Sequence, residues 1–303
     1  MTVNSNIIKH RLAKFIGEYI DSFYKVEDVQ FTYCLEFLFH NLMEYKTNQG
    51  IAHECADALN DILSIKKISQ SLKEPIAKHL IKLKEGIKDA SFSIYFDVIH
   101  EIILNIDIDD FVVPLVEALV SRILVEVIPL TRMKFNVTGG NKESNKYNLI
   151  VNKSFNIIRC ITDKESYVSK YILHLEEILK PVFDYMKNPK RIDFDEDIVL
   201  ILTSFIKYTK TITQSALTIL PTLSLYMKKN KGLTLDLYEL INQYIVFGNG
   251  IIDVNEEYYT HIMKLLNLAF GKKIEYELSG FLSACLIQIW LQVIHINIEL
   301  SKS

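Results

Sequence analysis

The chain has 303 residues, of which 49% are hydrophobic and 23% are charged, a balance that excludes an intrinsically disordered polypeptide. Its 34 basic and 37 acidic residues leave a net charge of −3. The sequence shows no stripe of basic residues that could bind along a phosphate backbone, so we expect no direct nucleic-acid partner. The 10 glycines and 6 prolines are too few for the many tight turns of a β-rich fold. Composition therefore favours long helices.

Apolar residues recur with helical spacing along almost the whole chain, as in the stripe formed by Phe31, Leu35, Leu38 and Leu42. No segment shows a sustained alternation of apolar and polar residues, so no strand is predicted. Acidic residues before apolar stretches and glycines after them mark several helix ends. The predicted helices span 6–24, 28–46, 51–66, 71–88, 91–105, 111–133, 147–162, 166–187, 193–209, 213–229, 233–248, 254–270 and 273–300.

These helices repeat in pairs. Taking every second helix from residue 28, the starts recur about every 40–47 residues, which is the period of HEAT and armadillo repeats. One spacing is longer, roughly 55 residues, and contains the polar insert 136–145 (NVTGGNKESN). The pattern predicts an all-α fold: a HEAT-repeat α-solenoid, a right-handed superhelix of antiparallel pairs with about six repeats plus an N-terminal helix. We expect a single array over 1–303 with no separate second domain.

The last predicted helix has an alternative interpretation. No Asp, Glu, Lys or Arg occurs between 278 and 298, which is long enough to span a bilayer. Gln288, Gln292 and His295 recur every three or four residues and share one helix face, which instead favours a helix buried on one side. This helix has no obvious polar outer face, so we expect further repeats or a partner to cover it. The N-terminus lacks the apolar core of a signal peptide, and no secretory leader is expected.

Motifs for catalysis or cofactor binding do not occur: there is no GxGxxG, phosphate loop, HExxH or GxSxG. The four cysteines lie far apart in apolar helical contexts, which predicts buried free thiols in a reducing compartment: Cys34, Cys55, Cys160 and Cys285. The i,i+4 pair His40 and Glu44 lacks a visible third metal ligand. We expect no enzyme, cofactor or metal; an enzyme with an unrecognised helical site is the alternative.

Acidic residues gather at one helix start, where Asp193, Asp195, Glu196 and Asp197 open the helix predicted at 193–209. As paired carboxylates for acid–base catalysis they lack polar partners. As charges near the positive end of a helix dipole they need no further role. A third interpretation, which makes them candidate protein-binding residues, is an acidic concave surface for a basic protein segment.

Aromatic residues, 16 Tyr and 16 Phe, follow the apolar stripes. Core packing is the main role that this spacing indicates. Some aromatic residues on the outer helices would instead leave apolar slots between repeats, where aromatic side chains of a bound peptide insert.

The order of several longer segments carries a resemblance. They are FTYCLEFLFHNLMEY with GIAHECADALNDILS, then EPIAKHLIKLKEGIKDASFSIYFDVIHEIILNI, VVPLVEALVSRILVEVI and NKSFNIIRCIT, and above all DFDEDIVLILTSFIKYTKTITQSALTILPTLSLYMKKN followed by DLYELINQYIVFG. A helix with an acidic start leads to a short polar turn, a proline-bearing helix and a helix that ends in aromatic residues. From about Phe31 to Phe270 the chain resembles the middle third of an importin-β superfamily receptor (karyopherin), in the branch of importins seven and eight.

The resemblance implies a nuclear transport receptor or a segment of one. Such receptors shuttle between cytoplasm and nucleus through the nuclear pore, carry protein cargo, bind phenylalanine–glycine nucleoporins and release cargo on binding Ran-GTP. Members are roughly three times longer, with their main Ran contacts in N-terminal repeats that this chain lacks. Their insert tends to be acidic, whereas Lys142, Glu143 and Lys146, also candidate protein-binding residues, leave this one slightly basic. The alternative function is a non-transport HEAT scaffold subunit of a stable multiprotein complex.

Overall fold

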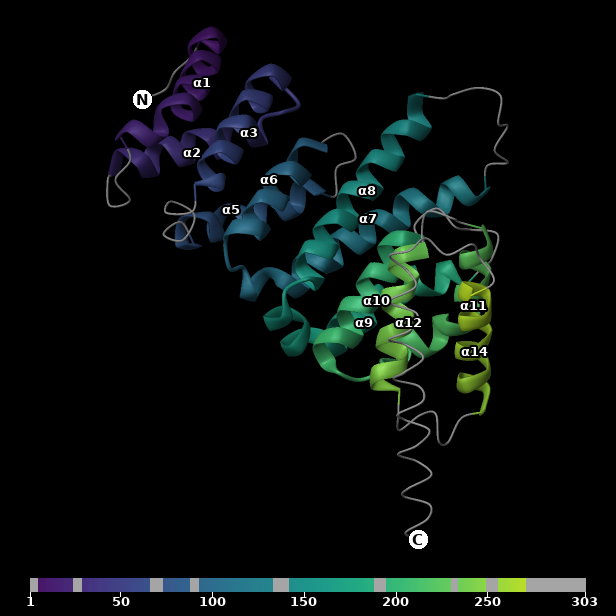
Figure 1. Ribbon diagram of the computed structural model, residues 1–303. Coiled ribbons are helices and arrows are strands. Elements are labelled where there is room, and N and C mark those ends of the chain that lie inside the picture. Colours follow the sequence, from purple (N-terminus) through teal and green to yellow (C-terminus); the bar gives the residue numbers. More distant parts are fainter. Residues whose placement is uncertain are drawn as a thin grey trace. The chain divides into compact units, whose positions relative to one another are not determined.

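The computed structural model describes residues 5–23, 29–65, 73–87, 93–132, 142–187, 195–229, 234–248 and 256–270 (Figure 1). Within these ranges every regular element is helical: twelve α-helices and one 3-10 turn, η1(Asp109–Phe111). The chain divides into two compact units, Met1–Ile161 and Thr162–Ser303, here called unit 1 and unit 2 and each described by itself. The single array over 1–303 stays a prediction.

Unit 1 consists of helices in two rows. Helices α2, α5 and α7 pack in one row, α1, α3 and α6 pack in the other, and the contacts α2–α3 and α5–α6 join the rows. Helix α8 meets α6, because Lys153 donates to the Asp97 carboxylate at 2.7 Å. The bounds are α1(Asn6–Phe23), α2(Val29–Met43), α3(Gln49–Ser64), α5(Lys73–Ile87), α6(Ser93–Asn105), α7(Val112–Arg132) and α8(Lys142–Thr162).

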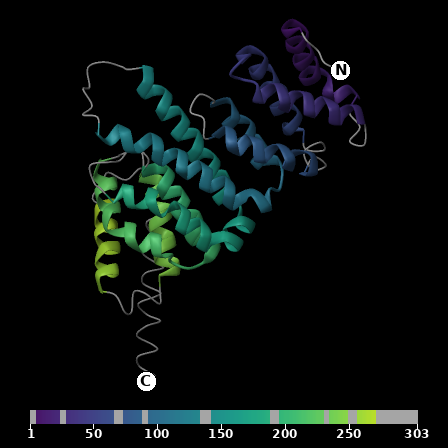
Figure 2. The ribbon, with the colours of Figure 1, turned by 180° about the vertical axis from the view of Figure 1, so that it is seen from behind.

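Unit 2 repeats this plan. Helices α9, α11 and α14 pack in one row and α10 and α12 in the other, and both views of the molecule show α11 beside α14 (Figures 1 and 2). The contacts α9–α10, α11–α12 and α12–α14 connect the rows. The bounds are α9(Glu165–Met186), α10(Asp195–Thr209), α11(Gln214–Lys229), α12(Thr234–Phe247) and α14(Glu256–Phe270).

The all-helical prediction is confirmed for the described residues, and alternation between two rows within each unit is compatible with an α-solenoid. The predicted insert 136–145 is partly wrong, because α8 begins at Lys142 and its last four residues are helical. Asn145 and its neighbours contain no Gly or Pro to stop the helix, whereas Gly139 and Gly140 precede Lys142. Residues 133–141 and the helix predicted at 273–300 lie outside the described residues.

Small residues set the packing of the N-terminal helices. Helix α3 buries Ile51, Leu59 and Ile62 on one side, with Ala58 beside them. A Cβ placed on Gly17 of α1 would lie 3.1 Å from both the Cα and the Cβ of Ala58. The absence of a larger side chain at either position therefore lets α1 approach the backbone of α3 closely.

Four prolines lie within the described helices α5, α7, α9 and α11. Pro75 and Pro114 lie in the first turns of α5 and α7, where the backbone N–H groups have no partner within the helix. Pro181 and Pro221 lie inside α9 and α11, where each removes one helical hydrogen bond. Within each unit these helices share a row: α5 and α7 in unit 1, and α9 and α11 in unit 2.

Membrane insertion was considered for residues 278–298, which lie outside the described residues. No helix in the described part of the chain combines the length and the apolar character needed to cross a bilayer. The membrane interpretation of 278–298 is therefore untested.

Candidate functional site

The acidic candidate residues lie at the start of α10, as predicted. Asp195 is the first residue of the helix, Glu196 is exposed and Asp197 is half-buried in the first turn. Asp193 lies outside the described residues, as does the side chain of Asp195. A helix that opens with carboxylates is stabilised by its dipole, so the structure accounts for these charges without a ligand. Their role in protein binding stays a prediction.

The candidates Lys142, Glu143 and Lys146 belong to the first two turns of α8 and not to a loop. Their side chains lie outside the described residues. The sequence placed these three positions in a polar insert and made them candidate protein-binding residues. Because their backbone is helical, any such contact would involve one end of a helix.

The expected burial of the cysteines is correct only for Cys55 among the described residues. Burial, with the nearby Glu54 carboxylate, raises the pKa of the Cys55 thiol to about 12. Cys34 and Cys160 are half-exposed, because each lies at the edge of its helix's apolar stripe and not at its centre. Cys285 lies outside the described residues. The described part of the chain holds no group of three or more side chains placed to bind a metal ion.

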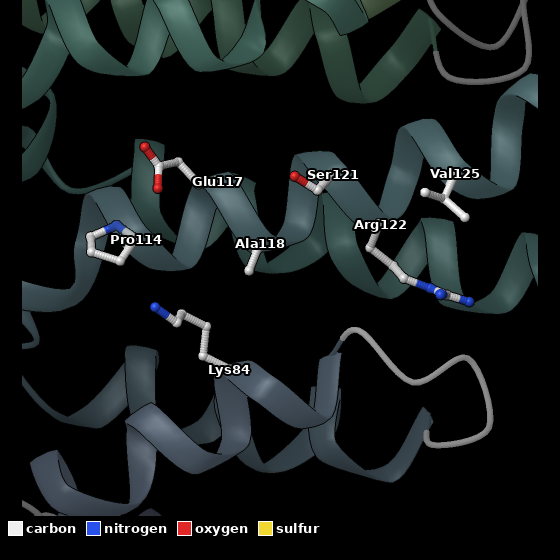
Figure 3. Close-up of a pocket in the computed structure, with 7 residues that line it drawn as sticks. All are labelled: Lys84, Pro114, Glu117, Ala118, Ser121, Arg122 and Val125. Atoms are coloured by element: carbon white, nitrogen blue, oxygen red, sulfur yellow. The ribbon is translucent and has the colours of Figure 1, made fainter.

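A slot between α5 and α7 is the candidate binding site in the described part of unit 1 (Figure 3). Its volume is about 350 Å³. Because α5 and α7 are neighbours in one row, the slot lies where consecutive helix pairs meet. It is lined by Lys84 from α5 and by Pro114, Glu117, Ala118, Ser121, Arg122 and Val125 from α7.

The slot has an apolar floor and a cationic edge. Figure 3 shows Lys84 extending from α5 toward Pro114 and Ala118, whereas Glu117 points away from α5. Arg122 is only 7% exposed at one end, and Val125 is 60% exposed at the rim. An apolar side chain of a ligand would lie on Ala118, and a carboxylate beside it would approach Lys84.

The sequence predicted apolar slots between repeats beside aromatic residues, whereas none of the described residues that line this slot is aromatic. Residues 114, 118, 121 and 125 follow the spacing i, i+4, i+7, i+11, so they share one face of α7. That face carries proline, alanine, serine and valine, where the neighbouring faces carry leucine and isoleucine. The signal that could have located the slot was this stripe of small residues on α7, which faces α5, the preceding helix in the same row.

No protein-family model, no curated protein and no solved structure matches this chain. The resemblance to the importin-β superfamily thus rests on the order of the sequence segments, and membership of that family stays a prediction. The two-row helical architecture and the slot between α5 and α7 are the features that bear on function.

Proposed function

We propose that this chain is a protein-binding scaffold that holds a peptide segment of its partner in the slot between α5 and α7. The slot is the single observation that carries this proposal. Its volume of about 350 Å³ is at the small end of the range for ligand pockets, which suits one or two peptide side chains better than a large cofactor.

The lining residues favour a peptide of mixed apolar and acidic character. Ala118 and Pro114 offer an apolar surface on which a phenylalanine or leucine side chain is desolvated. Lys84 and Arg122 supply two positive charges against the one negative charge of Glu117. Charge complementarity therefore selects a peptide in which aspartate or glutamate flanks the apolar residue.

A binding measurement with defined peptides tests the proposal. The probe is a fluorescent twelve-residue peptide with phenylalanine and leucine among aspartates and glutamates, and its partner carries lysines in place of the acids. We expect the acidic peptide to bind the full chain at least ten times more tightly. Lys84→Glu should abolish that preference, whereas Lys82→Glu, on an exposed position of the same helix, should keep it. Equal binding of both peptides would contradict the proposed charge selection.

A second pair of variants tests the place of binding. Val125→Asp puts a like charge at the rim of the slot and should weaken the acidic peptide at least ten-fold. Leu104→Asp introduces the same change at an exposed position of α6 outside the slot and should leave binding unaltered. Circular dichroism confirms that both variants are folded. If the two variants bind alike, the peptide lies elsewhere on the protein.

We further propose that the scaffold is a nuclear transport receptor of the importin-β kind, or a segment of one, active in the cytoplasm, the nucleus and the nuclear pore. The order of the sequence segments and the slot between α5 and α7 support this proposal. Immobilised phenylalanine–glycine repeats, a basic histone-like cargo peptide and Ran-GTP are the probes. Binding to the repeats should fall with Ala118→Trp, which fills the slot, but persist in Lys84→Glu because these repeats carry little charge. A folded chain that binds neither repeats nor cargo is not such a receptor.

The exposed face of α1 favours a second function, a scaffold subunit of a stable complex. Ile8, Phe15 and Tyr19 are exposed and share a face at spacings of seven and four residues, and the Phe15 and Tyr19 rings lie 4.9 Å apart. A stable partner would cover such a stripe. Native purification of the tagged chain should then yield one stoichiometric complex, and Phe15→Glu should dissociate it. Recovery of a monomer under those conditions argues for the transport proposal.

A further inference from the structure

A thiol, an imidazole and a carboxylate meet where α8 packs on α6. The Sγ atom of Cys160 lies 3.3 Å from Nε2 of His100. The other ring nitrogen of His100, Nδ1, lies 3.7 Å from Oε1 of Glu101. The imidazole therefore stands between a nucleophilic sulfur and a carboxylate, with a different ring nitrogen directed to each.

The carboxylate in this cluster is itself held in place. The side-chain amide of Asn105, one turn further along α6, donates to Oε2 of Glu101 at 3.3 Å and to the Glu101 backbone carbonyl at 3.0 Å. Oε1 is thereby left directed toward His100. A carboxylate near Nδ1 favours the tautomer that carries its proton there, so that Nε2 offers its lone pair to the thiol.

The cluster is open to small molecules. The side chains of His100 and Glu101 are 34% and 28% exposed, and Cys160 is half-exposed. Cys55 differs in both respects, because it is fully buried within α3 and burial holds its proton tightly. A thiol that combines access with a proton acceptor is the type that reacts with oxidants, whereas a buried thiol is inert.

We propose that Cys160 is a redox-modification site at which His100 activates the thiol for oxidation by hydroperoxides. The thiol proton moves to Nε2 of His100, and the sulfur attacks one oxygen of the peroxide. The S–O bond forms as the O–O bond breaks, and the departing oxygen takes the proton from the imidazolium. Sulfur is oxidised by two electrons to a sulfenic acid, and the hydroperoxide is reduced to water or an alcohol. A low-molecular-weight thiol then forms a mixed disulfide with release of water.

This proposal is independent of peptide binding in the slot. Helices α6 and α8 belong to neighbouring helix pairs, and the ion pair between Asp97 and Lys153 also joins them. A polar oxygen or a bulky mixed disulfide on Cys160 would lie against this joint. Oxidation of Cys160 thus changes the contact between two helix pairs. Through this contact the packing of unit 1 depends on redox conditions.

Competition among the cysteines of the unmodified full chain provides the first test. The protein is exposed to hydrogen peroxide at neutral pH with a sulfenic-acid trapping reagent, and each cysteine is quantified by peptide mass spectrometry. We expect Cys160 to be labelled at least ten times faster than Cys34, which has comparable exposure, and Cys55 to stay unlabelled. Labelling of Cys160 no faster than Cys34 would overturn the proposal without the need for any variant.

Variants then separate activation from simple access. His100→Gln should lower the Cys160 rate at least ten-fold, whereas His79→Gln, which changes a histidine stacked on Phe39, should not. Glu101→Gln tests a positioning residue: it should shift the pH profile of Cys160 labelling toward higher pH and leave that of Cys34 in place. Of the other charged groups on these two helices, Asp97 of α6 and Lys153 of α8 form a hydrogen bond with each other. Arg159 precedes Cys160 in the sequence of α8. An unchanged rate in folded His100→Gln rules out activation by the imidazole.

Discussion

Units 1 and 2 share a feature that allows them to be compared. In each, a buried tyrosine donates a hydrogen bond to a backbone carbonyl near the end of another helix. In unit 1, Tyr95 of α6 donates its hydroxyl to the carbonyl of Leu42, the penultimate residue of α2, at 3.2 Å. In unit 2, Tyr258 of α14 donates to the carbonyl of Tyr244 in the last turn of α12, at 2.8 Å. Carbonyls in the last turn of a helix have no hydrogen-bond donor within the helix, so in each unit a tyrosine hydroxyl from another helix is the donor.

The two units surround this bond differently. In unit 2 the hydroxyl of Tyr244 donates in turn to the Ala216 carbonyl of α11 at 2.6 Å, and the rings of Tyr244 and Tyr258 meet edge to face at 6.1 Å. This tyrosine chain links three helices through buried neutral groups. Unit 1 combines the Tyr95 hydrogen bond with partly exposed ion pairs such as Lys9–Glu44 at 3.7 Å. Substitutions in the core and a rise in pH should therefore lower the stability of unit 2 more than that of unit 1.

Glycine substitutions should give the largest effect. A Cβ on Gly248 would lie 2.3 Å from the Tyr244 carbonyl oxygen and 2.5 Å from the Tyr258 hydroxyl, whereas on Gly86 it would lie 2.7 Å from two ring atoms of Tyr95. We expect Gly248→Ala to lower the free energy of unfolding by roughly 3 kcal/mol and Gly86→Ala by roughly 2 kcal/mol, because the added methyl displaces a buried side chain and weakens its hydrogen bond. Urea unfolding measures the loss, and peptide-level hydrogen exchange assigns it to a unit.

Gly50→Ala is the control for those two variants. No atom lies within 4 Å of the Cβ position at Gly50, which is the second residue of α3. Alanine there should stabilise the protein by about 0.5 to 1 kcal/mol, since it reduces the freedom of the unfolded chain. Similar losses for all three substitutions would show that close approach of a tyrosine is not the cause.

Alkaline pH should separate the units next. Burial, and then the adjacent Tyr258, raise the pKa of Tyr244 well above its usual value of 10.0, and burial also raises the pKa of Tyr258. Above pH 10 the unfolded chain releases these protons while the folded chain keeps them, so stability present at neutral pH is lost as the pH rises. Each group contributes a slope of about 1.4 kcal/mol per pH unit.

Urea unfolding from pH 8 to pH 12 measures these slopes. Burial also raises the pKa of Tyr238 in α12, so hydrogen exchange should show unit 2 opening with at least twice the slope of a single group above pH 10. Unit 1 should lose stability with the slope of one group from about pH 9, because Cys55 titrates near 12 when folded. Tyr258→Phe should lower the slope of unit 2 by that of one group. Equal slopes in both units would contradict the assignment of more raised pKa values to unit 2 than to unit 1.

Removal of single hydroxyl groups should have a smaller effect. Tyr244→Phe should cost about 1.5 kcal/mol and Tyr258→Phe about 1 kcal/mol, because a buried carbonyl loses its partner in each case. Tyr95→Phe should cost about 0.5 kcal/mol, in keeping with its longer bond of 3.2 Å. Tyr259→Phe, next to Tyr258 but 42% exposed, should leave thermal and urea unfolding unchanged. If Tyr259→Phe lowered the stability as much as Tyr258→Phe, burial of the hydroxyl would not be the cause of the loss.

The helices were predictable from sequence because their cause is local. The apolar period and the acidic start place α10 to within two residues of its predicted bounds of 193–209. The helix predicted at 233–248 ends at a glycine, Gly248, and α12 ends one residue before it, at Phe247. The physical role of this glycine is different from the one expected, because no described glycine has a positive φ and Gly248 instead makes room for the Tyr258 hydroxyl.

The contacts between helices were not predictable in the same way. Tyr95 and Leu42 are 53 residues apart, and Cys160 and His100 are 60 residues apart. A repeat period brings their helices together but does not determine which side chains face each other, since that depends on the rotation of each helix. The slot has the same origin: its small residues are visible in the sequence, yet only the position of α5 shows that they face a neighbouring helix.

A left-handed residue in unit 2 offers a small predicted gain in stability and tests whether the units unfold separately. Lys210 follows α10 with φ 55, and its N–H donates to the Ile206 carbonyl at 2.8 Å. Glycine adopts this conformation without a steric penalty, so Lys210→Gly should stabilise the protein by roughly 0.5 to 1 kcal/mol. Lys207→Gly removes the same charge inside the last turn of α10 and should destabilise it by about 1 kcal/mol. Hydrogen exchange should show both shifts in unit 2 with unit 1 unchanged; parallel shifts in unit 1 would mean that the two units open as one cooperative body.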